Sequence, residues 1–166
     1  EKLSFPITVI GAGAIGSLLG HRLAHAGHGV TLVGRPGYVR AVQAHGLHLE
    51  EGAKAKQGRS LALYGRTVYP KAVERILDLP ASQRLWDLVL LTVKAYDTQE
   101  AAQSLAPYVS PDVPLLIVQN GVGGEELAQQ ALNQATIISG AITLSVSVLA
   151  AGHIRLETTR GGLSLA

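Results

Sequence analysis

The sequence is poor in several residue types, and each shortage excludes a class of protein. Cysteine is absent from the 166 residues, which excludes disulfide bonds and thiolate metal ligands. Aromatic residues make up only 4% of the chain against 47% hydrophobic residues, so a core must be built mainly from Leu, Val, Ile and Ala. No apolar run approaches the roughly 18 residues of a membrane-spanning helix, and the first residues lack a signal-peptide core. We therefore expect a cytoplasmic protein that does not bind membranes.

Charge is also sparse and nearly balanced. The 14 basic and 12 acidic residues leave a formal net charge of +2, and no basic run is interleaved with aromatic residues. This pattern argues against a nucleic-acid partner. The length can bury a sizeable core, and no linker or repeat divides the chain, so we expect one domain over residues 1–166. Methionine is absent even at the first position, which indicates a trimmed chain.

The most informative segment is a glycine-rich turn near the N-terminus. Residues 7–10 are strand-like, run directly into Gly-Ala-Gly-Ala-Ile-Gly, and are followed by an apolar stripe at helical spacing that stops at Gly27. In this context the first glycine permits a tight turn, the second lets a pyrophosphate approach the backbone, and the third lets helix and strand pack closely. The positive end of the helix dipole also favours phosphate. The predicted nucleotide-binding residues are Gly11, Ala12, Gly13, Ala14, Ile15 and Gly16.

The end of the next strand predicts which dinucleotide binds. An NAD site carries a carboxylate about 20 residues after the first glycine, where it binds the ribose 2′-hydroxyl. Residues 30–35 contain no acid and close on Arg35, whose guanidinium suits a 2′-phosphate. The pattern therefore favours NADP(H) over NAD. A solvated Arg35 is the alternative, and a role for the nearby Arg40 is left open.

The rest of the chain alternates strand-like and helix-like segments, which predicts a Rossmann-type, doubly wound and mainly parallel sheet with antiparallel edge strands at its C-terminal end. We expect strands over residues 30–33, 47–50, 61–64, 67–69, 88–93, 114–118, 137–148, 153–157 and 163–165. We expect helices over residues 36–44 and 98–105 and from about 123 onward, with a helix or irregular connection over 71–85.

Two polar residues follow predicted parallel strands at the edge where ligands of such sheets bind. Lys94 closes the strand-like run 87–93, and Asn120 closes the run 115–119. A lysine there can attract phosphates or an anionic substrate, and an asparagine can both donate and accept hydrogen bonds. A surface position for Lys94 and a simple turn at Asn120-Gly121 are equally compatible with the spacing.

These motifs occur in the order and spacing typical of one family. The glycine turn, Gly34-Arg35, Thr-Val-Lys-Ala-Tyr-Asp over 92–97 and Gln-Asn-Gly-Val over 119–122 together resemble the N-terminal domain of ketopantoate reductases. The resemblance extends to residues 140–143, 151–154 and 161–163 and covers essentially the whole chain. It implies NADPH-dependent reduction of 2-dehydropantoate, a small 2-oxo acid, to pantoate in the pathway to pantothenate and coenzyme A.

The resemblance also implies roles for single residues. Residues 11–16 would hold the pyrophosphate, and Arg35 would hold the 2′-phosphate. Lys94 would contact the cofactor, and Asn120 would lie between the nicotinamide and the substrate. Val146 corresponds to a further cofactor contact that needs only its backbone.

The family pattern also predicts what these 166 residues lack. Family members are roughly twice as long and carry a helical C-terminal domain that supplies the catalytic lysine and the substrate-binding side chains. We therefore expect no catalytic residue here, NADPH binding with negligible ketopantoate reduction, and an exposed apolar surface where that domain docks. Pairing of two copies in a homodimer is an open alternative for that surface. Two other functions stay open, a reductase of another 2-oxo or 3-hydroxy acid and a stand-alone NADP-binding module that regulates a partner.

A metal site is not predicted. His21 and His25 have the i, i+4 spacing of a metal-binding pair on a helix, but no third ligand accompanies them in sequence. We expect both to be surface histidines.

Overall fold

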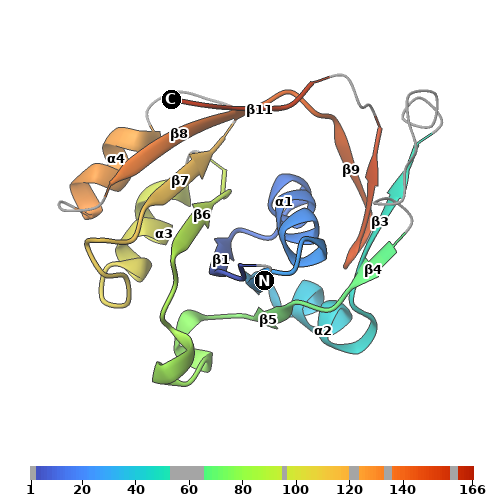
Figure 1. The fold of residues 1–166 in the computed structure, drawn as a ribbon, viewed down its shortest axis with the longest axis horizontal. Helices are drawn as coiled ribbons and strands as arrows, with labels where there is room; N and C mark the ends of the chain where they lie inside the picture. The colour runs from blue at the N-terminus through green and yellow to red at the C-terminus, as the bar shows by residue number, and fades with distance from the viewer. Residues whose placement is uncertain (1–2, 53–65, 95–96, 120–123, 133–135, 158–160) are drawn as a thin grey trace.

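The computed structural model describes residues 3–52, 66–94, 97–119, 124–132, 136–157 and 161–166. Within these residues the main sheet has the strand order β11-β8-β7-β6-β1-β2-β5 (Figure 1). Its strands are β1 (Pro6–Ile10), β2 (Gly29–Val33), β5 (Lys71–Val73), β6 (Leu88–Leu91), β7 (Leu115–Val118), β8 (Ile137–Ile142) and β11 (Leu163–Leu165). All neighbours pair in parallel except β11, which runs antiparallel to β8 at the edge. The predicted Rossmann-type fold with an antiparallel C-terminal edge is confirmed.

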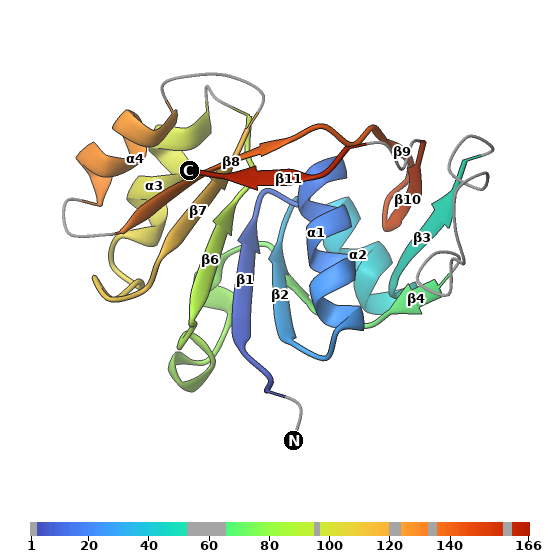
Figure 2. The same cartoon turned by 45° about the horizontal axis from the view of Figure 1, so that its top comes forward.

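Helices cover both faces of this sheet, as Figure 2 shows. They are α1 (Ala14–His25), α2 (Pro36–His45), α3 (Thr98–Leu105) and α4 (Gly124–Ala131), with short 3-10 turns at Ile76–Asp78 and Ala81–Gln83. Alternate residues of the strands point to opposite faces. Val89 and Leu91 of β6 pack towards α3 and α4, whereas Leu90 packs towards α1 and α2. Burial on both faces explains why β6 and β7 are uninterrupted apolar runs.

A second sheet, with the order β4-β3-β10-β9, lies on the far side of α1 (Figures 1 and 2). It contains β3 (Leu47–Glu51), β4 (Arg66–Val68), β9 (Val146–Ala150) and β10 (His153–Leu156). Leu18 of α1 is fully buried against Leu49, Ile154 and Leu156 of this sheet. Because α1 is covered on two sides, it is an interior helix rather than a surface helix.

Three expectations differ from the structure. Residues 137–148 are not one strand, because the chain leaves the main sheet after Ile142 and enters the second sheet at Val146. Residues 71–85, for which we expect a helix or an irregular connection, begin with the strand β5, which pairs with β2, and continue through two short 3-10 turns, so the α-helix is wrong and the strand was missed. His21 is not a surface histidine, because it is 1% exposed and its Nε2 donates to the Arg66 carbonyl of β4 over 2.9 Å. The predicted strand over residues 61–64 lies outside the described residues.

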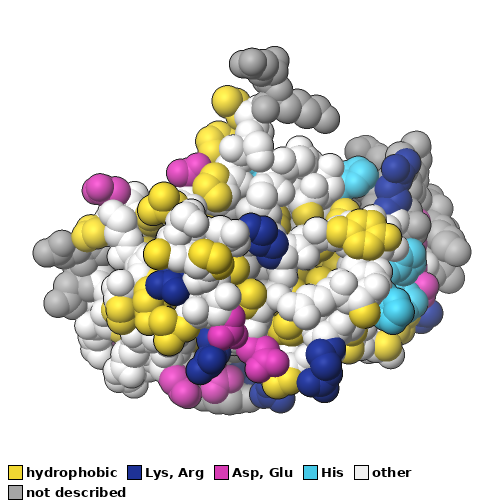
Figure 3. All heavy atoms as spheres, turned by 90° about the horizontal axis from the view of Figure 1, so that it is seen from below, with side chains coloured by type: hydrophobic (Ala, Val, Ile, Leu, Met, Phe, Trp, Pro, Cys, Tyr) yellow, Lys and Arg dark blue, Asp and Glu magenta, His cyan; other side chains and the backbone are white. Residues whose placement is uncertain are grey.

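The surface combines apolar and charged side chains. The face in Figure 3 carries scattered hydrophobic groups, and histidines gather at its right-hand edge, on the side of β3 and β4 in Figure 1. Leu163 and Leu165 of β11 are exposed, as are Val148 and Leu149 of β9. These residues supply exposed apolar surface near the C-terminal end, and what docks there stays a prediction. No helix in the described part of the chain has the length and apolar character needed to cross a membrane.

Candidate functional site

The glycine turn lies at the carboxyl end of β1, between the ends of β2 and β6. The N–H groups of Gly11 and Ala12 both donate to the Val33 carbonyl of β2, over 3.1 and 3.3 Å. Gly11 has φ +93°, a conformation that L side chains rarely adopt. A Cβ added there would come within 2.6 Å of Val93 Cγ1 and 2.8 Å of the Val93 nitrogen. Only glycine therefore fits this turn without displacing the chain after β6.

The other two glycines of the motif differ in a way that separates packing from ligand binding. A Cβ on Gly16 would overlap the Gly11 carbonyl and lie 2.5 Å from Thr92 Oγ1, so this glycine serves helix–strand packing. A Cβ on Gly13 would meet no atom within 4 Å, and Gly13 is exposed at the N-cap of α1. Because the first N–H groups of a helix have no partner within it, Gly13 opens the positive end of α1 to an approaching anion.

Thr92 holds the glycine turn from the neighbouring strand. Its hydroxyl lies 2.7 Å from the Gly11 carbonyl and 3.1 Å from the Ile10 carbonyl, just after the end of β6. Sequence reasoning did not assign Thr92 a role, because the contact spans 81 positions and leaves no local pattern.

Arg35 follows β2 in a segment that passes close to the glycine turn. A Cβ on the preceding Gly34 would come 3.1 Å from Ala12 Cβ and 2.9 Å from the ring of Tyr38. The main chain at Gly34 therefore passes close to the turn, and Arg35 follows as the exposed N-cap of α2. An exposed guanidinium is chemically suited to a phosphate, and its role here stays a prediction.

Tyr38 links the two helices beneath the turn. Its hydroxyl lies 2.9 Å from that of the buried Ser17 on α1. Burial raises the pKa of Tyr38 to about 12, and the Ser17 hydrogen bond partly opposes that rise. The neutral phenol therefore fixes α2, and with it Arg35, relative to α1 at ordinary pH.

The ends of β6 and β7 are tied together next to the turn. The Gln119 amide donates to the Val93 carbonyl over 2.9 Å and to the Thr98 hydroxyl at the start of α3. Lys94 follows Val93 directly and is exposed at this edge. Asn120 follows Gln119 but lies outside the described residues, so its role stays a prediction. Gln119 is a further residue that sequence reasoning missed, because glutamine after a strand has no distinctive signature.

Val146 lies in a different part of the fold from the other predicted contacts. It begins β9 of the second sheet, pairs with Leu156, and packs its half-buried side chain against the cluster around Leu18. Its side chain thus serves packing beside α1. The predicted backbone contact with a cofactor stays a prediction.

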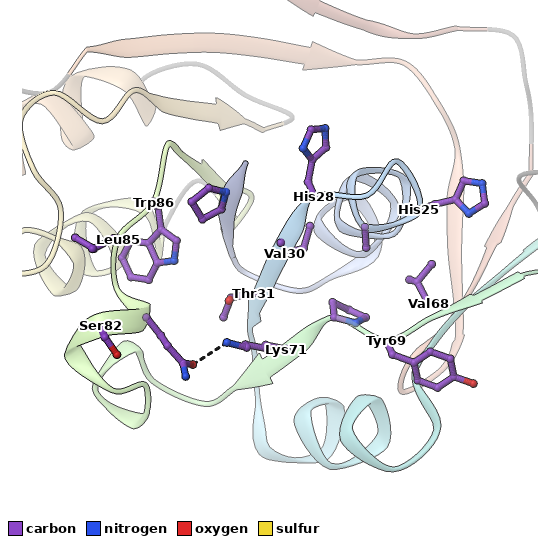
Figure 4. A pocket seen from close by; sticks show the side chains of 15 residues that line it. His25, His28, Val30, Thr31, Val68, Tyr69, Lys71, Ser82, Leu85 and Trp86 are labelled. Atoms are coloured by element: carbon purple, nitrogen blue, oxygen red, sulfur yellow. Dashed lines mark hydrogen bonds between the residues drawn. The ribbon is translucent and has the colours of Figure 1, made fainter. Parts of the chain in front are cut away.

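A cavity of about 770 Å³ lies at the opposite edge of the main sheet, where β1, β2 and β5 begin (Figure 4). Trp86 and Thr31 line it, and Lys71 donates to Gln83 across its rim over 2.8 Å. Ligands of open parallel sheets bind at the carboxyl ends of the strands. We therefore place the candidate site at the glycine turn and not in this cavity.

The strand order and the glycine turn define a Rossmann-type α/β domain. A family model described as "Ketopantoate reductase PanE/ApbA" matches residues 7–166, and the chain therefore belongs to the ketopantoate reductase family, a family of oxidoreductases. A solved PanE/ApbA family ketopantoate reductase from Ralstonia eutropha JMP134 superimposes with a TM-score of 0.80 at 31% identity, over 96% of this chain and 48% of that one.

Two curated relatives with similar identity to this chain differ in named activity. A 2-dehydropantoate 2-reductase of Pyrococcus horikoshii is 38% identical over 72% of this chain and 34% of its own length. A glycerol-3-phosphate dehydrogenase [NAD(P)+] of Afipia carboxidovorans is 36% identical over 70% of this chain and 32% of its own length. The chain thus spans about a third of the length of these two relatives.

Proposed function

We propose that this chain binds NADPH at the carboxyl edge of its main sheet, as the cofactor-binding part of a 2-dehydropantoate 2-reductase. The observation that carries the proposal is that the three motif glycines differ in the space around them. Gly11 and Gly16 leave no room for a Cβ because protein atoms occupy the space, whereas Gly13 faces open space at the start of α1. A pyrophosphate placed there meets unpaired helix N–H groups and the positive end of the helix dipole.

The flanking residues extend this site towards both ends of a dinucleotide. Arg35, beside Ala12, is assigned to the 2′-phosphate, because a guanidinium forms two charge-assisted hydrogen bonds with a phosphate. Lys94 is assigned to the cofactor from the edge of β6. Asn120 is assigned to the nicotinamide end and the substrate, and the backbone of Val146 to a further contact.

When bound, NADPH supplies a hydride to the ketone carbon of the substrate, leaving NADP⁺ and an alkoxide that must take up a proton. The residues of this chain seat and orient the dinucleotide. The relatives extend well beyond the shared stretch, so we assign the general acid to a helical domain outside these 166 residues. The proposal keeps the place in pantothenate synthesis that the family resemblance implies and the cytoplasmic location expected from the sequence.

The relatives support a nicotinamide cofactor and leave the substrate less defined. The name of the Afipia relative includes NAD(P)+, and the name of the Pyrococcus relative gives 2-dehydropantoate as substrate. Because the two share similar identity with this chain, a reductase of another oxo or hydroxy acid stays as the second candidate.

The experiment that tests the proposal is a calorimetric titration of the chain with NADPH and, separately, with NADH. We expect NADPH to bind at least about tenfold tighter. Arg35→Ala should weaken NADPH binding about 10- to 100-fold, as expected for a hydrogen bond to a charged group, and leave NADH binding little changed. Arg66→Ala, which removes an exposed arginine at the start of β4 in the second sheet, is the matched control for loss of surface charge.

The titration tests the preference for NADPH separately from the binding site at the glycine turn. Equal affinity for the two cofactors would mean that Arg35 only faces solvent and that the NADP assignment is wrong. Absence of binding by both cofactors would overturn the glycine turn as a site that functions within these residues.

A further inference from the structure

A cluster of polar side chains lies on the outer face of the second sheet, away from the nucleotide site. Strands β3 and β10 pair in parallel, with His48 opposite His153 and Glu50 opposite Arg155. The alternating residues Leu49 and Ile154 point inward to the core against α1. The four polar residues therefore share the opposite face. Figure 3 shows histidines gathered at the surface on the side of these strands.

The cluster brings together three side chains that can bind a transition metal. His48, Glu50 and His153 each offer one ligand atom, and these atoms lie within 4.8 Å of one another. Nε2 of His153 and Oε2 of Glu50 are 3.0 Å apart, and the two imidazole centroids are 4.9 Å apart with the rings edge to face. Ligand bonds of roughly 2.0–2.1 Å in a tetrahedral zinc site place ligand atoms about 3.3 Å apart. The distance between the His153 and Glu50 ligand atoms is thus already close to the distance that a tetrahedral zinc site requires.

Hydrogen bonds from neighbouring side chains orient His48 and Glu50. Nδ1 of His48 lies 2.9 Å from the Thr67 hydroxyl of β4, the kind of contact that orients a ligating imidazole. Arg155 donates to Oε1 of Glu50 from Nε over 2.8 Å and from a terminal nitrogen over 2.7 Å, which leaves Oε2 turned to His153.

We infer that His48, Glu50 and His153 form a binding site for a divalent transition-metal ion of the Zn²⁺ type. Two imidazoles and one carboxylate suit zinc or cobalt better than calcium or magnesium, which prefer oxygen ligands alone. The ion replaces the hydrogen bond between His153 and Glu50, with the imidazole proton carried on Nδ1, and water completes the coordination. The three residues come from two strands that are far apart in sequence, so no local spacing of ligands predicted this site.

The consequence of binding is a cross-link between β3 and β10. These strands lie about 100 positions apart in sequence, as the 105-residue separation of Glu50 and Arg155 shows. An ion that binds only the folded pairing stabilises it by mass action. At a free metal concentration of 100 times Kd, the midpoint of thermal unfolding should rise by roughly 5–10 °C.

The test is a titration of the metal-free 166-residue chain with Co²⁺, followed through the visible absorption of the bound ion, and with Zn²⁺ as competitor. We expect saturation at one ion per chain, the intense bands of four-coordinate cobalt, and displacement by Zn²⁺. Glu50→Gln and His153→Gln should each weaken binding at least about tenfold. His45→Gln, an exposed histidine outside the cluster, is the matched control and should bind as the wild type does.

Each outcome decides the inference. Because the substituted side chains are half-exposed, circular dichroism should show folded variants, and the zinc-dependent rise in unfolding temperature should fall by at least about half in both of them. Failure of the wild-type chain to saturate would overturn the metal site. Binding that survives His153→Gln, or is weakened equally by His45→Gln, would do the same. None of these measurements involves NADPH, so they stand apart from the test of the proposed function.

Discussion

Replacing Gly11 and Gly13 by alanine, one at a time, should separate the stability of the glycine turn from its ligand binding. Gly11 has φ +93° and faces Val93, whereas Gly13 has φ −85° and faces open space. We expect Gly11→Ala to destabilise the fold. Gly13→Ala should leave the fold nearly unchanged and weaken NADPH binding.

The magnitude for Gly11 follows from two separate costs. An alanine in a left-handed backbone conformation costs about 1–2 kcal/mol. Its Cβ would also lie 2.8 Å from the Val93 nitrogen, a backbone atom that can move only with β6, and such overpacking costs about 1–3 kcal/mol. The sum is about 2–5 kcal/mol, or a fall in the unfolding midpoint of roughly 4–20 °C for a chain of this size.

Gly13→Ala should change the free energy of unfolding little and the NADPH affinity more. Its φ is accessible to alanine, and the new methyl group meets no protein atom within 4 Å, so the free energy of unfolding should change by less than about 1 kcal/mol. The methyl group would occupy the space through which a pyrophosphate approaches the backbone. We expect at least about a tenfold loss of NADPH affinity, or about 1.4 kcal/mol.

The assay combines urea unfolding, followed by circular dichroism, with calorimetric titration of each variant at a temperature where all are folded. Tight NADPH binding by Gly13→Ala would refute the assignment of the open space to the cofactor. A loss of stability in Gly13→Ala as large as that in Gly11→Ala would refute the steric reasoning itself.

Two further predictions concern polar side chains that hydrogen-bond to the backbone of other elements. Thr92→Val should lower the free energy of unfolding by about 1–2 kcal/mol, because the hydroxyl contacts with the Gly11 and Ile10 carbonyls are lost. Urea unfolding with Thr92→Ser as control measures this loss, and equal stability of the valine variant would contradict the role of the hydroxyl. Burial lowers the pKa of His21 in the folded chain below its value of about 6.5 in the unfolded chain. The unfolded chain therefore binds a proton more readily, so the contribution of His21 to the stability of the fold is greatest above about pH 6.5 and falls as the pH drops below that value. His21→Gln should therefore lose less stability than the wild type between pH 7 and 5, and parallel pH profiles of the two proteins would disprove this.

Local signals predicted the parts of the fold that hold the candidate site. The strand, turn and helix over residues 6–25 carry their own apolar periodicity and glycine spacing, and the helix Thr98–Leu105 has its predicted bounds. Arg35 lies beside the turn because β2 pairs in parallel with β1, so both strands end at one edge. These features follow from short-range pattern and from the general geometry of parallel sheets.

Long-range pairing accounts for what sequence reasoning missed. The strand Lys71–Val73 is too short for a periodic signal and exists because β2 offers an edge for it. His21 is buried because the second sheet covers α1. The residues near His21 in sequence carry no pattern that predicts this contact. Thr92 and Gln119 act on atoms contributed by other strands, so their roles appear only when the strands are assembled. The predicted roles of Lys94, Asn120 and Val146 stay predictions.

The path of the chain between the two sheets also has a consequence for folding during synthesis. The parallel partner of strand β3 is β10, about 100 residues later, and the intervening chain contains β5, β6, β7 and β8 of the main sheet. Until residues 146–156 have emerged from the ribosome, β3 has no partner on that side and the apolar face of α1 around Leu18 stays open to solvent. Such long-range closure is slow, and the exposed strand edge is prone to pairing with other chains. A nascent chain that stops before residue 146 should therefore engage chaperones, and one that reaches residue 156 should be released from them.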